Sequence, residues 1–174
     1  KPDYGPVMLH KTAGVTAIGA RNFLIAYNIN LNSKDKKIAT DIALDIREQG
    51  RNKRNKKGKF VRDKNGEPIK VPGILKSCKA VGWYIEEYGL AQVSMNLTNF
   101  NDTPPHIAFE ETRRQARERG VRVSGSELVG LIPLESMIAA GKYYLNKQKR
   151  SIGTPTKDII HIAVKSMGLD DLSP

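Results

Sequence analysis

The hydrophobic pattern of residues 19–31 predicts a β-strand with two different faces. Large apolar residues recur there at every second position, as Phe23, Ile25, Tyr27, Ile29 and Leu31. The positions between them become polar toward the end of the run, where Asn28 and Asn30 share one face. Because a buried amide costs free energy unless it is paired, these two side chains either bond to neighbouring polar groups or face a wet cleft.

The next stretch predicts an amphipathic helix. Ile38, Ile42 and Ile46 recur at every fourth position, so they share one face of a helix. Ser33 can cap its start, and Gly50 marks where it should end.

Two further strands are expected at residues 80–87 and 91–97, joined across Tyr88 and Gly89. Apolar residues alternate along both strands: Val81, Trp83 and Ile85 on the first, and Val93, Met95 and Leu97 on the second. Between the latter lie Gln92, Ser94 and Asn96, which together with Asn28 and Asn30 would form either a ligand floor or an ordinary solvent-facing sheet surface.

The rest of the chain predicts one more strand and three helices. Thr103 can cap a helix that begins at Pro104 and Pro105 and ends at Gly120. A strand over residues 121–132 contains small residues at 124–126, where we expect a bulge. Helices over residues 134–148 and 156–167 complete the chain.

This order of elements predicts an α/β two-layer sandwich. It is the split, ferredoxin-like βαββαβ arrangement, with a mixed or antiparallel sheet, helices on one face and additional C-terminal helices. Because the helices cover one face only, the other face must be wet, bind a ligand or pack on another domain.

Length and cysteine content add few constraints. A chain of 174 residues can bury about 70% of its unfolded surface, so one ordinary core is expected. The single cysteine, Cys78, cannot form an internal disulfide, and no apolar run approaches the length of a membrane span or a signal peptide. These features favour a cytoplasmic protein without a membrane partner. Because the chain begins with Lys1 rather than Met, we expect an excised segment of a longer protein.

The net charge of +11 is concentrated in one segment. Residues 47–79 contain twelve Lys or Arg against three acidic residues, which accounts for nine of the eleven charges. The segment is either a mobile, solvated insertion, a surface that steers an acidic small ligand, or a nucleic-acid surface. Nucleic-acid binding is the weakest of these readings, because Phe60 is the only aromatic in the basic loop.

Common catalytic motifs are missing from the sequence. It contains no phosphate loop, dinucleotide fingerprint, paired cysteines or helical His-Glu metal spacing, so no metal is expected. His106 and His161 fit ordinary helical packing or surface positions, whereas His10 lies in a Gly-rich loop that leads to Arg21 beside the first strand. That loop either carries function or simply connects two domains.

Gln49 and Arg51 flank Gly50 after the first predicted helix. An amide and a guanidinium together can clamp a carboxylate through charge-assisted hydrogen bonds. The alternative is a left-handed helix cap followed by a solvated arginine.

Five blocks of the sequence closely resemble the formiminotransferase family. They are PDYGP, GARNFLIAYNINL, IREQGR, VGWYIEEYGLAQVSMNLTNF and VSGSELVGLIPLE. They occur in the family's order and spacing and cover nearly the whole chain, which is similar to the family's C-terminal subdomain.

The resemblance implies a folate-dependent one-carbon transferase. The reaction would move a formimidoyl group from N-formimidoyl-L-glutamate to tetrahydrofolate, giving 5-formimidoyltetrahydrofolate and L-glutamate in histidine degradation. Tetrahydrofolate would be a co-substrate, and the enzyme a cytoplasmic homodimer. In the family, folate lies between two subdomains and the catalytic histidine belongs to the N-terminal one, so this chain supplies no catalytic residue and should be inactive alone.

The resemblance also implies a folate-binding segment. It corresponds to Gly5, Pro6, Val7, Met8, Leu9, His10, Lys11, Thr12, Ala13 and Gly14. The middle of this segment departs from the family, which favours backbone over side-chain contacts. We accordingly expect residues 1–18 to form a folate-binding linker from the N-terminal subdomain and residues 19–174 to form the C-terminal subdomain.

The candidate substrate-binding residues from the pattern are Arg21, Asn28, Gln49, Arg51 and Gln92. Two alternative functions stay open. One keeps the fold with a different reaction, as a glutamate formyltransferase or a 5-formyltetrahydrofolate-metabolising homologue. The other is a basic RNA-binding module, which would need exposed aromatics on the two central strands.

Overall fold

A four-stranded sheet organises the computed structural model, which describes residues 1–170. Its elements are, in chain order, β1 (Ile25–Leu31), α1 (Lys36–Ile46), β4 (Cys78–Ile85), β5 (Leu90–Leu97), α2 (Pro105–Glu118) and β6 (Val123–Val129). The strand order is β4-β5-β1-β6, and every neighbouring pair is antiparallel. This is the predicted ferredoxin-like βαββαβ sandwich.

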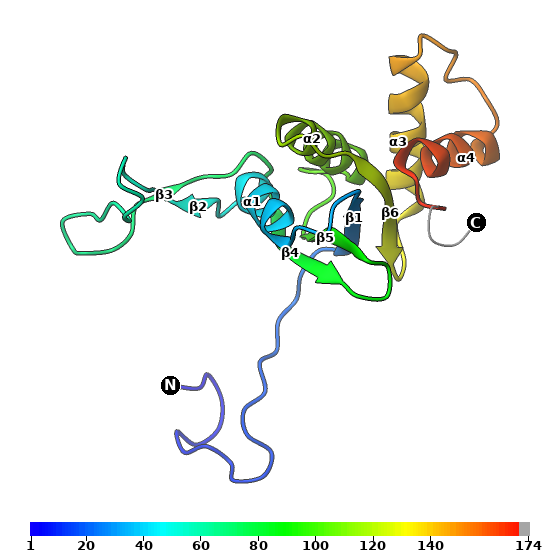
Figure 1. Cartoon of the computed structure of the whole chain (residues 1–174). Coiled ribbons are helices and arrows are strands. Elements are labelled where there is room, and N and C mark those ends of the chain that lie inside the picture. The colour runs from blue at the N-terminus through cyan, green and yellow to red at the C-terminus, as the bar shows by residue number, and fades with distance from the viewer. Residues whose placement is uncertain (171–174) are drawn as a thin grey trace.

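One face of the sheet forms the core beneath α1 and α2 (Figure 1). The inward side chains of the two central strands are buried: Ile25, Tyr27, Ile29 and Leu31 from β1, and Ala91, Val93, Met95 and Leu97 from β5. The alternation that predicted an apolar face on each of these strands is therefore confirmed.

Two more helices, α3 (Leu134–Lys147) and α4 (Thr156–Met167), pack on each other beyond β6 (Figure 1). The end of α4 is attached to β6 by Ser126, whose backbone N–H donates to the Gly168 carbonyl at 2.8 Å and whose hydroxyl donates to the Met167 carbonyl at 2.6 Å. β6 thereby satisfies two carbonyls at the end of this helix, where intrahelical donors run out.

The basic segment forms a hairpin that projects from the body (Figure 1). Its base is the short ladder of β2 (Arg51–Asn52) and β3 (Lys70–Val71), and beyond it two isolated bridges, Arg54 with Phe60 and Arg62 with Pro68, each close a separate loop. A tight turn lies at Asn65-Gly66, and the Asp63 N–H donates to the Glu67 carbonyl across it.

Several predicted boundaries and caps are wrong. The helix α1 is capped by Asp35, whose carboxylate accepts from the Lys37 N–H at 2.8 Å, rather than by Ser33. Thr103 does not cap α2, because its hydroxyl donates instead to the Lys76 carbonyl at 2.7 Å. Phe23 lies outside β1 with 47% of its surface exposed. The bulge predicted in β6 is confirmed, since the pairing with β1 shifts at Ser124.

In β4 the large apolar side chains point away from the helices, whereas those of β1 and β5 point toward them. Its inward positions are the small residues Cys78, Ala80 and Gly82, whereas Val81 and Trp83 point outward and are 56% and 41% exposed. The close approach of α1 explains this, because a Cβ on Gly82 would lie 2.1 Å from the Thr40 nitrogen. Trp83 therefore belongs to the polar face of the sheet, on an edge strand, and not to the core.

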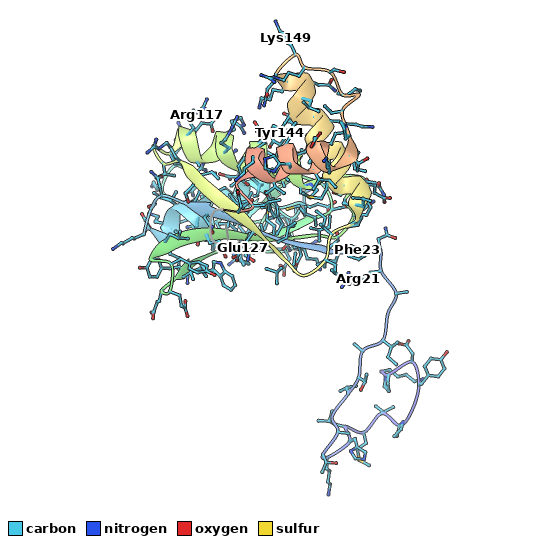
Figure 2. The ribbon with its side chains drawn as sticks, turned by 90° about the vertical axis from the view of Figure 1, so that its right-hand side faces the viewer. Arg21, Phe23, Arg117, Glu127, Tyr144 and Lys149 are labelled. Atoms are coloured by element: carbon cyan, nitrogen blue, oxygen red, sulfur yellow. The ribbon has the colours of Figure 1, made fainter. Side chains whose placement is uncertain are left out.

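The N-terminal segment extends away from the sandwich (Figures 1 and 2). Residues 1–23 are almost entirely exposed and contain no helix or strand, apart from a turn in which the Gly14 N–H donates to the His10 carbonyl at 3.0 Å. The sheet begins at Ile25, and the division at residue 18 stays a prediction. Within the part of the chain described, no helix has both the length and the apolarity required to cross a bilayer.

Replacing Gly82 with alanine should strongly destabilise the fold. The added methyl group would meet the backbone of α1, which cannot yield as a flexible side chain can, so we expect a loss of about 3 kcal/mol in the free energy of unfolding. Urea denaturation measures this. Gly153→Ala is the matched control, because a Cβ there meets only the Ser151 hydroxyl at 3.5 Å. Equal midpoints for the two variants would contradict the packing argument.

His106 is a buried titratable group between α2 and α3. It is 7% exposed, and its ring lies 4.7 Å from that of Tyr143. Burial lowers its pKa to about 4, although the nearby Glu110 carboxylate acts in the opposite direction. The folded protein thus keeps the imidazole neutral at pH values where the unfolded chain protonates it.

This difference should make stability depend on pH. As the pH falls from about 6.5 toward 4, only the unfolded chain takes up this proton, so the free energy of unfolding should fall by on the order of 2–3 kcal/mol. His106→Phe should flatten that part of the profile, whereas His161→Gln, which alters an exposed histidine, should leave it unchanged. Thermal melts across this pH range provide the measurement, and identical profiles for wild type and His106→Phe would contradict the assignment.

Candidate ligand-binding face

The sheet face opposite α1 and α2 is mostly polar, and we call it the open face. It consists of outward residues from all four strands: Lys79, Val81 and Trp83 of β4, Gln92, Ser94 and Asn96 of β5, Ala26, Asn28 and Asn30 of β1, and Gly125, Glu127 and Val129 of β6. Figure 2 shows Glu127 on this side of the sheet, with Tyr144 among the helices on the other. The outer strands are separated by three strand spacings, roughly 14 Å, so the face can accommodate an elongated ligand.

A hydrogen-bond network lies in the middle of this face, and Trp83 determines which of its groups donate and which accept. The indole Nε1–H can only donate, and it donates to Gln92 Oε1 at 2.7 Å. Gln92 must therefore point its Nε2 the other way, where it donates to Asn30 Oδ1 at 2.7 Å and to Glu127 Oε1 at 3.2 Å. One donor-only group thus orients both amides.

Glu127 is the acceptor on which this network converges. Its Oε1 also accepts from Asn28 Nδ2 at 2.8 Å, so two amides from two different strands hold the same oxygen. Asn28, Asn30 and Gln92 are all at least nine-tenths buried although they belong to the open face. The pairing alternative is therefore confirmed for both asparagines, because each takes part in the network, and contact of either side chain with a ligand stays a prediction.

One amide group in the network is not satisfied. Asn30 Nδ2 is buried and finds no acceptor within residues 1–170. An unpaired buried donor costs about 1–3 kcal/mol, and native folds retain few such groups. This donor lies beneath the open face, next to the amide group of Gln92.

A cavity of about 690 Å³ lies where the open face meets the edge of β4. Val81, Ser94 and Asn96 form its open-face side, and Arg47 and Gln49 form its wall after α1. A second cavity of about 610 Å³ continues from Gln49 to Lys53 and the base of the basic hairpin. The open face is thus connected around the β4 edge to the most basic part of the chain.

The predicted site residues are only partly brought together. Asn28 and Gln92 belong to the central network, and Gln49 is exposed beside the neighbouring cavity. The whole segment Gly5, Pro6, Val7, Met8, Leu9, His10, Lys11, Thr12, Ala13 and Gly14 lies in the N-terminal extension, away from the open face. Arg21 belongs to the same extension (Figure 2), and its one hydrogen-bond acceptor among residues 1–170 is the neighbouring Asn22 carbonyl.

The guanidinium of Arg51 is occupied by acidic groups of α1. Its Nε lies 2.6 Å from Asp45 Oδ1, its Nη1 lies 3.5 Å from Asp41 Oδ1, and its Nη2 donates to the Asp41 carbonyl at 2.7 Å. The Asp45 carboxylate also pairs with Arg119. Arg51 therefore anchors the base of the hairpin to α1 through three of its own nitrogen atoms.

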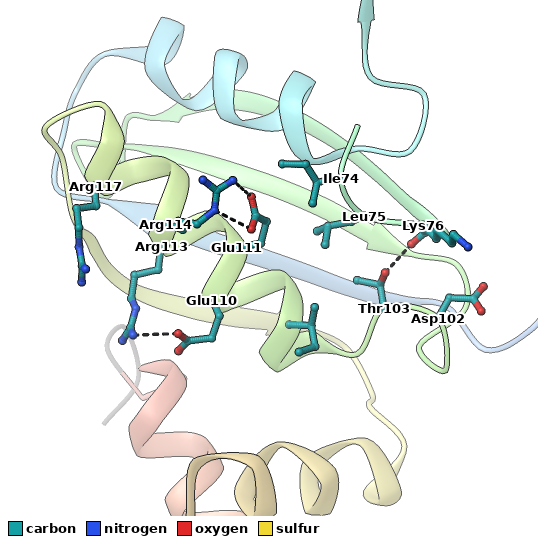
Figure 3. Close-up of a pocket in the computed structure, with 11 residues that line it drawn as sticks. Ile74, Leu75, Lys76, Asp102, Thr103, Glu110, Glu111, Arg113, Arg114 and Arg117 are labelled. Carbon is teal, nitrogen blue, oxygen red and sulfur yellow. Dashed lines mark hydrogen bonds and ion pairs between the residues drawn. The ribbon is translucent and has the colours of Figure 1, made fainter. Parts of the chain in front are cut away.

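A further cavity, of about 660 Å³, lies on the helical side between α2 and residues 74–76 (Figure 3). Four of its charged groups pair with one another, since Arg113 lies 2.9 Å from Glu110 and Arg114 lies 2.7 Å from Glu111. Figure 3 shows Arg117 pointing away from these pairs. The mutual neutralisation makes this cavity a weaker candidate for an anionic ligand than the open face.

The structure also describes the surroundings of Cys78 and of the potential metal-ligating side chains. The Cys78 thiol is buried, and burial, aided by the Glu48 charge, raises its pKa to about 12, so it holds its proton at neutral pH. Residues 1–170 contain no group of three or more potential metal-ligating His, Cys, Asp or Glu side chains.

The sequence analysis missed the two residues that define the network, Trp83 and Glu127. Trp83 was grouped with apolar residues by its alternation, and Glu127 carries no motif. The bulge at Ser124 is a partial signal, because it puts Glu127 on the same face as Gly125 and Val129, but only the register with β1 places Glu127 opposite Asn28.

The central strands also bear on the RNA-binding alternative. β5 and β1 are the middle strands of the sheet, and their outward residues include no aromatic side chain. Trp83 stands alone on an edge strand, and its N–H is already used by Gln92. A stacking platform for successive bases is therefore missing from the described residues of this face.

Comparison with known proteins places this arrangement in a family. The family model described as formiminotransferase domain matches residues 26–174. Formimidoyltransferase-cyclodeaminase of Mus musculus is 43% identical over 173 residues, which cover 99% of this chain and 29% of that protein. The protein of the same name from Dictyostelium discoideum is 41% identical over 174 residues, again 29% of its length.

A shorter relative supports the same conclusion. Glutamate formimidoyltransferase of Streptococcus pyogenes serotype M1 is 40% identical over 144 residues, covering 83% of this chain and 41% of that protein. The chain thus spans well under half the length of each of these relatives. Since the family model covers most of the chain, including every strand of the sheet except its first residue, the chain belongs to the formiminotransferase family.

Proposed function

We propose that this chain forms one wall of a folate cleft in an enzyme that transfers a formimidoyl group from N-formimidoyl-L-glutamate to tetrahydrofolate. The products would be 5-formimidoyltetrahydrofolate and L-glutamate. The observation that carries this proposal is the oriented network of Trp83, Gln92, Asn28 and Glu127 on an otherwise uncovered sheet face. Family membership supplies the reaction class.

The physical properties of the face suit a folate. A pterin ring carries several donors and acceptors on a flat heterocycle, and the fixed amides of the open face offer complementary groups without reorganising. The ring of Trp83, which is 41% exposed, adds an apolar surface at the side. The carboxylates of the folate tail would then extend toward the β4 edge and the basic hairpin.

The catalytic histidine and the second wall would come from a preceding N-terminal subdomain. Two features support this division: the relatives are much longer than this chain, and the open face has no cover among residues 1–170. Residues 5–14 would reach the folate once that subdomain positions the N-terminal extension. Assembly as a homodimer and location in the cytoplasm belong to the same proposal.

The first experiment is a calorimetric titration of the chain with 5-formyltetrahydrofolate, alone and with a separately expressed N-terminal subdomain. Binding that appears or tightens with the partner supports a shared cleft. Failure in both, with association of the two parts demonstrated, would remove the support for folate.

A single substitution tests the role of the network in this binding. Trp83→Phe keeps an aromatic ring but deletes the donor that orients Gln92, so we expect folate to bind about tenfold more weakly in the two-part complex. Tyr84→Phe is the matched control, because Tyr84 is the next residue of β4 and faces the helical side. Equal affinities for the two variants would count against an oriented floor, and thermal melts check that both remain folded.

The basic hairpin should raise the local concentration of ligands that carry carboxylates. Changing four of its residues to glutamine should weaken folate binding about threefold at low salt and flatten its salt dependence, because these charges act through long-range attraction. The four residues are Lys53, Arg54, Lys56 and Lys57.

The control removes the same charge from the far end of the molecule (Figures 1 and 2). The control residues, in and around α3 and α4, are Lys142, Lys149, Arg150 and Lys157. An affinity at low salt that is unchanged by the hairpin variant, or lowered equally by the control, would show that the hairpin does not steer this ligand.

A further inference from the structure

Glu127 differs from the other polar groups of the open face in carrying a full charge. Its carboxylate is half-buried, and no lysine or arginine of residues 1–170 lies within ion-pair distance of it. Only neutral amides compensate the charge, through the two bonds that Asn28 and Gln92 donate to Oε1. A partly buried charge without a counter-charge is costly, which favours a cationic partner for it.

The second carboxylate oxygen is available to such a partner. Within the described residues, Oε2 accepts no hydrogen bond and is not a buried unpaired atom, so it keeps contact with the surface of the open face. Because Oε1 is held from two strands, the carboxylate cannot swing freely, and the direction in which Oε2 can bind is set in advance.

We propose that Glu127 binds the formimidoyl group of the donor and makes the enzyme select formimidoyl over formyl donors. This inference rests on the proposed function and deepens it. A formimidoyl group on nitrogen is an amidine, whose protonated form carries a positive charge and N–H donors spread over an N–C–N unit. A carboxylate binds such a unit through charge-assisted hydrogen bonds.

The formyl group lacks what this carboxylate requires. It replaces the terminal nitrogen by an oxygen, which is neutral and can only accept. A formyl oxygen facing the carboxylate would place two acceptors against each other and leave Glu127 Oε2 without a donor, and sites built around a specific donor reject the analogue that lacks it. The fixed carboxylate would therefore discriminate between the two donor classes.

The pterin ring offers the same N–C–N donor edge, through its 2-amino group and ring N–H. We assign Glu127 to the formimidoyl group instead, because the pterin edge is neutral and would leave the charge of Glu127 uncompensated. If Glu127 binds the formimidoyl group, neutralising its carboxylate should affect the donor. If it binds the pterin ring, the same change should affect tetrahydrofolate.

The test is steady-state kinetics of the complete enzyme containing this chain, with N-formimidoyl-L-glutamate and N-formyl-L-glutamate as alternative donors. Glu127→Gln is nearly isosteric and can still accept from Asn28. We expect kcat/KM for the formimidoyl donor to fall on the order of 30-fold, with little change for the formyl donor or in the KM for tetrahydrofolate. Glu127→Asp keeps the charge and should preserve the donor preference even if its rate falls.

Each other outcome overturns the inference. An unchanged donor preference in Glu127→Gln, or an equal loss for both donors, would exclude Glu127 as the selecting group. A rise confined to the KM for tetrahydrofolate would assign Glu127 to the pterin. If the wild type transferred from neither donor, the proposed function would fail and this inference with it. Glu135→Gln, which neutralises an exposed carboxylate at the start of α3, controls for net charge, and thermal melts report on folding.

Discussion

The hydrogen bond from the Trp83 indole to Gln92 is the constraint on which the open face depends. An indole can donate but not accept, whereas each amide can turn either way, so this single bond removes the ambiguity from every amide linked to it. The order then extends over all four strands, from β4 through β5 and β1 to Glu127 on β6. Rigid β-strands hold all the participants, which makes the face a preorganised surface rather than a collection of solvated side chains.

That surface exists because the two faces of the sheet have separate tasks. The inward face of β1 is purely structural, and its four large residues are buried beneath the helices. The outward face of the same strand carries two amides that contribute nothing to that core. The core and the polar network therefore use alternate residues of one strand, so that each can change without directly disturbing the other.

The sequence predicted the fold well because its strongest signals are periodic. The alternation along β1 and β5 and the recurrence of isoleucine at every fourth position of α1 depend only on residues close together in the chain. These three elements are present as predicted. The alternation in β4 was ambiguous, since a period of two identifies two faces without telling which one is inside. The close approach of α1 at Gly82 decides that question, and it is a tertiary contact.

The candidate site was harder to predict because its contacts join distant parts of the chain. Asn28 and Glu127 are 99 residues apart, and Gln92 and Asn30 are 62 apart. Arg51 shows the same limitation. The sequence suggested a guanidinium that could bind a carboxylate ligand, but the turn after α1 places this guanidinium against Asp45. Residue types suggested a polar floor, but only the strand register could show which residue received the hydrogen bonds.

The bulge at Ser124 has an evolutionary consequence. Beyond it, Ser126 faces inward to the Tyr27 hydroxyl at 2.9 Å, while Glu127 faces outward to Asn28. Removing one residue on the strand side of this irregularity would exchange the two, placing a carboxylate in the core and a hydroxyl on the surface. β6 can therefore accept many substitutions during divergence but hardly any change in length, and an aligned homologue with a gap at this point would have lost the geometry of the face.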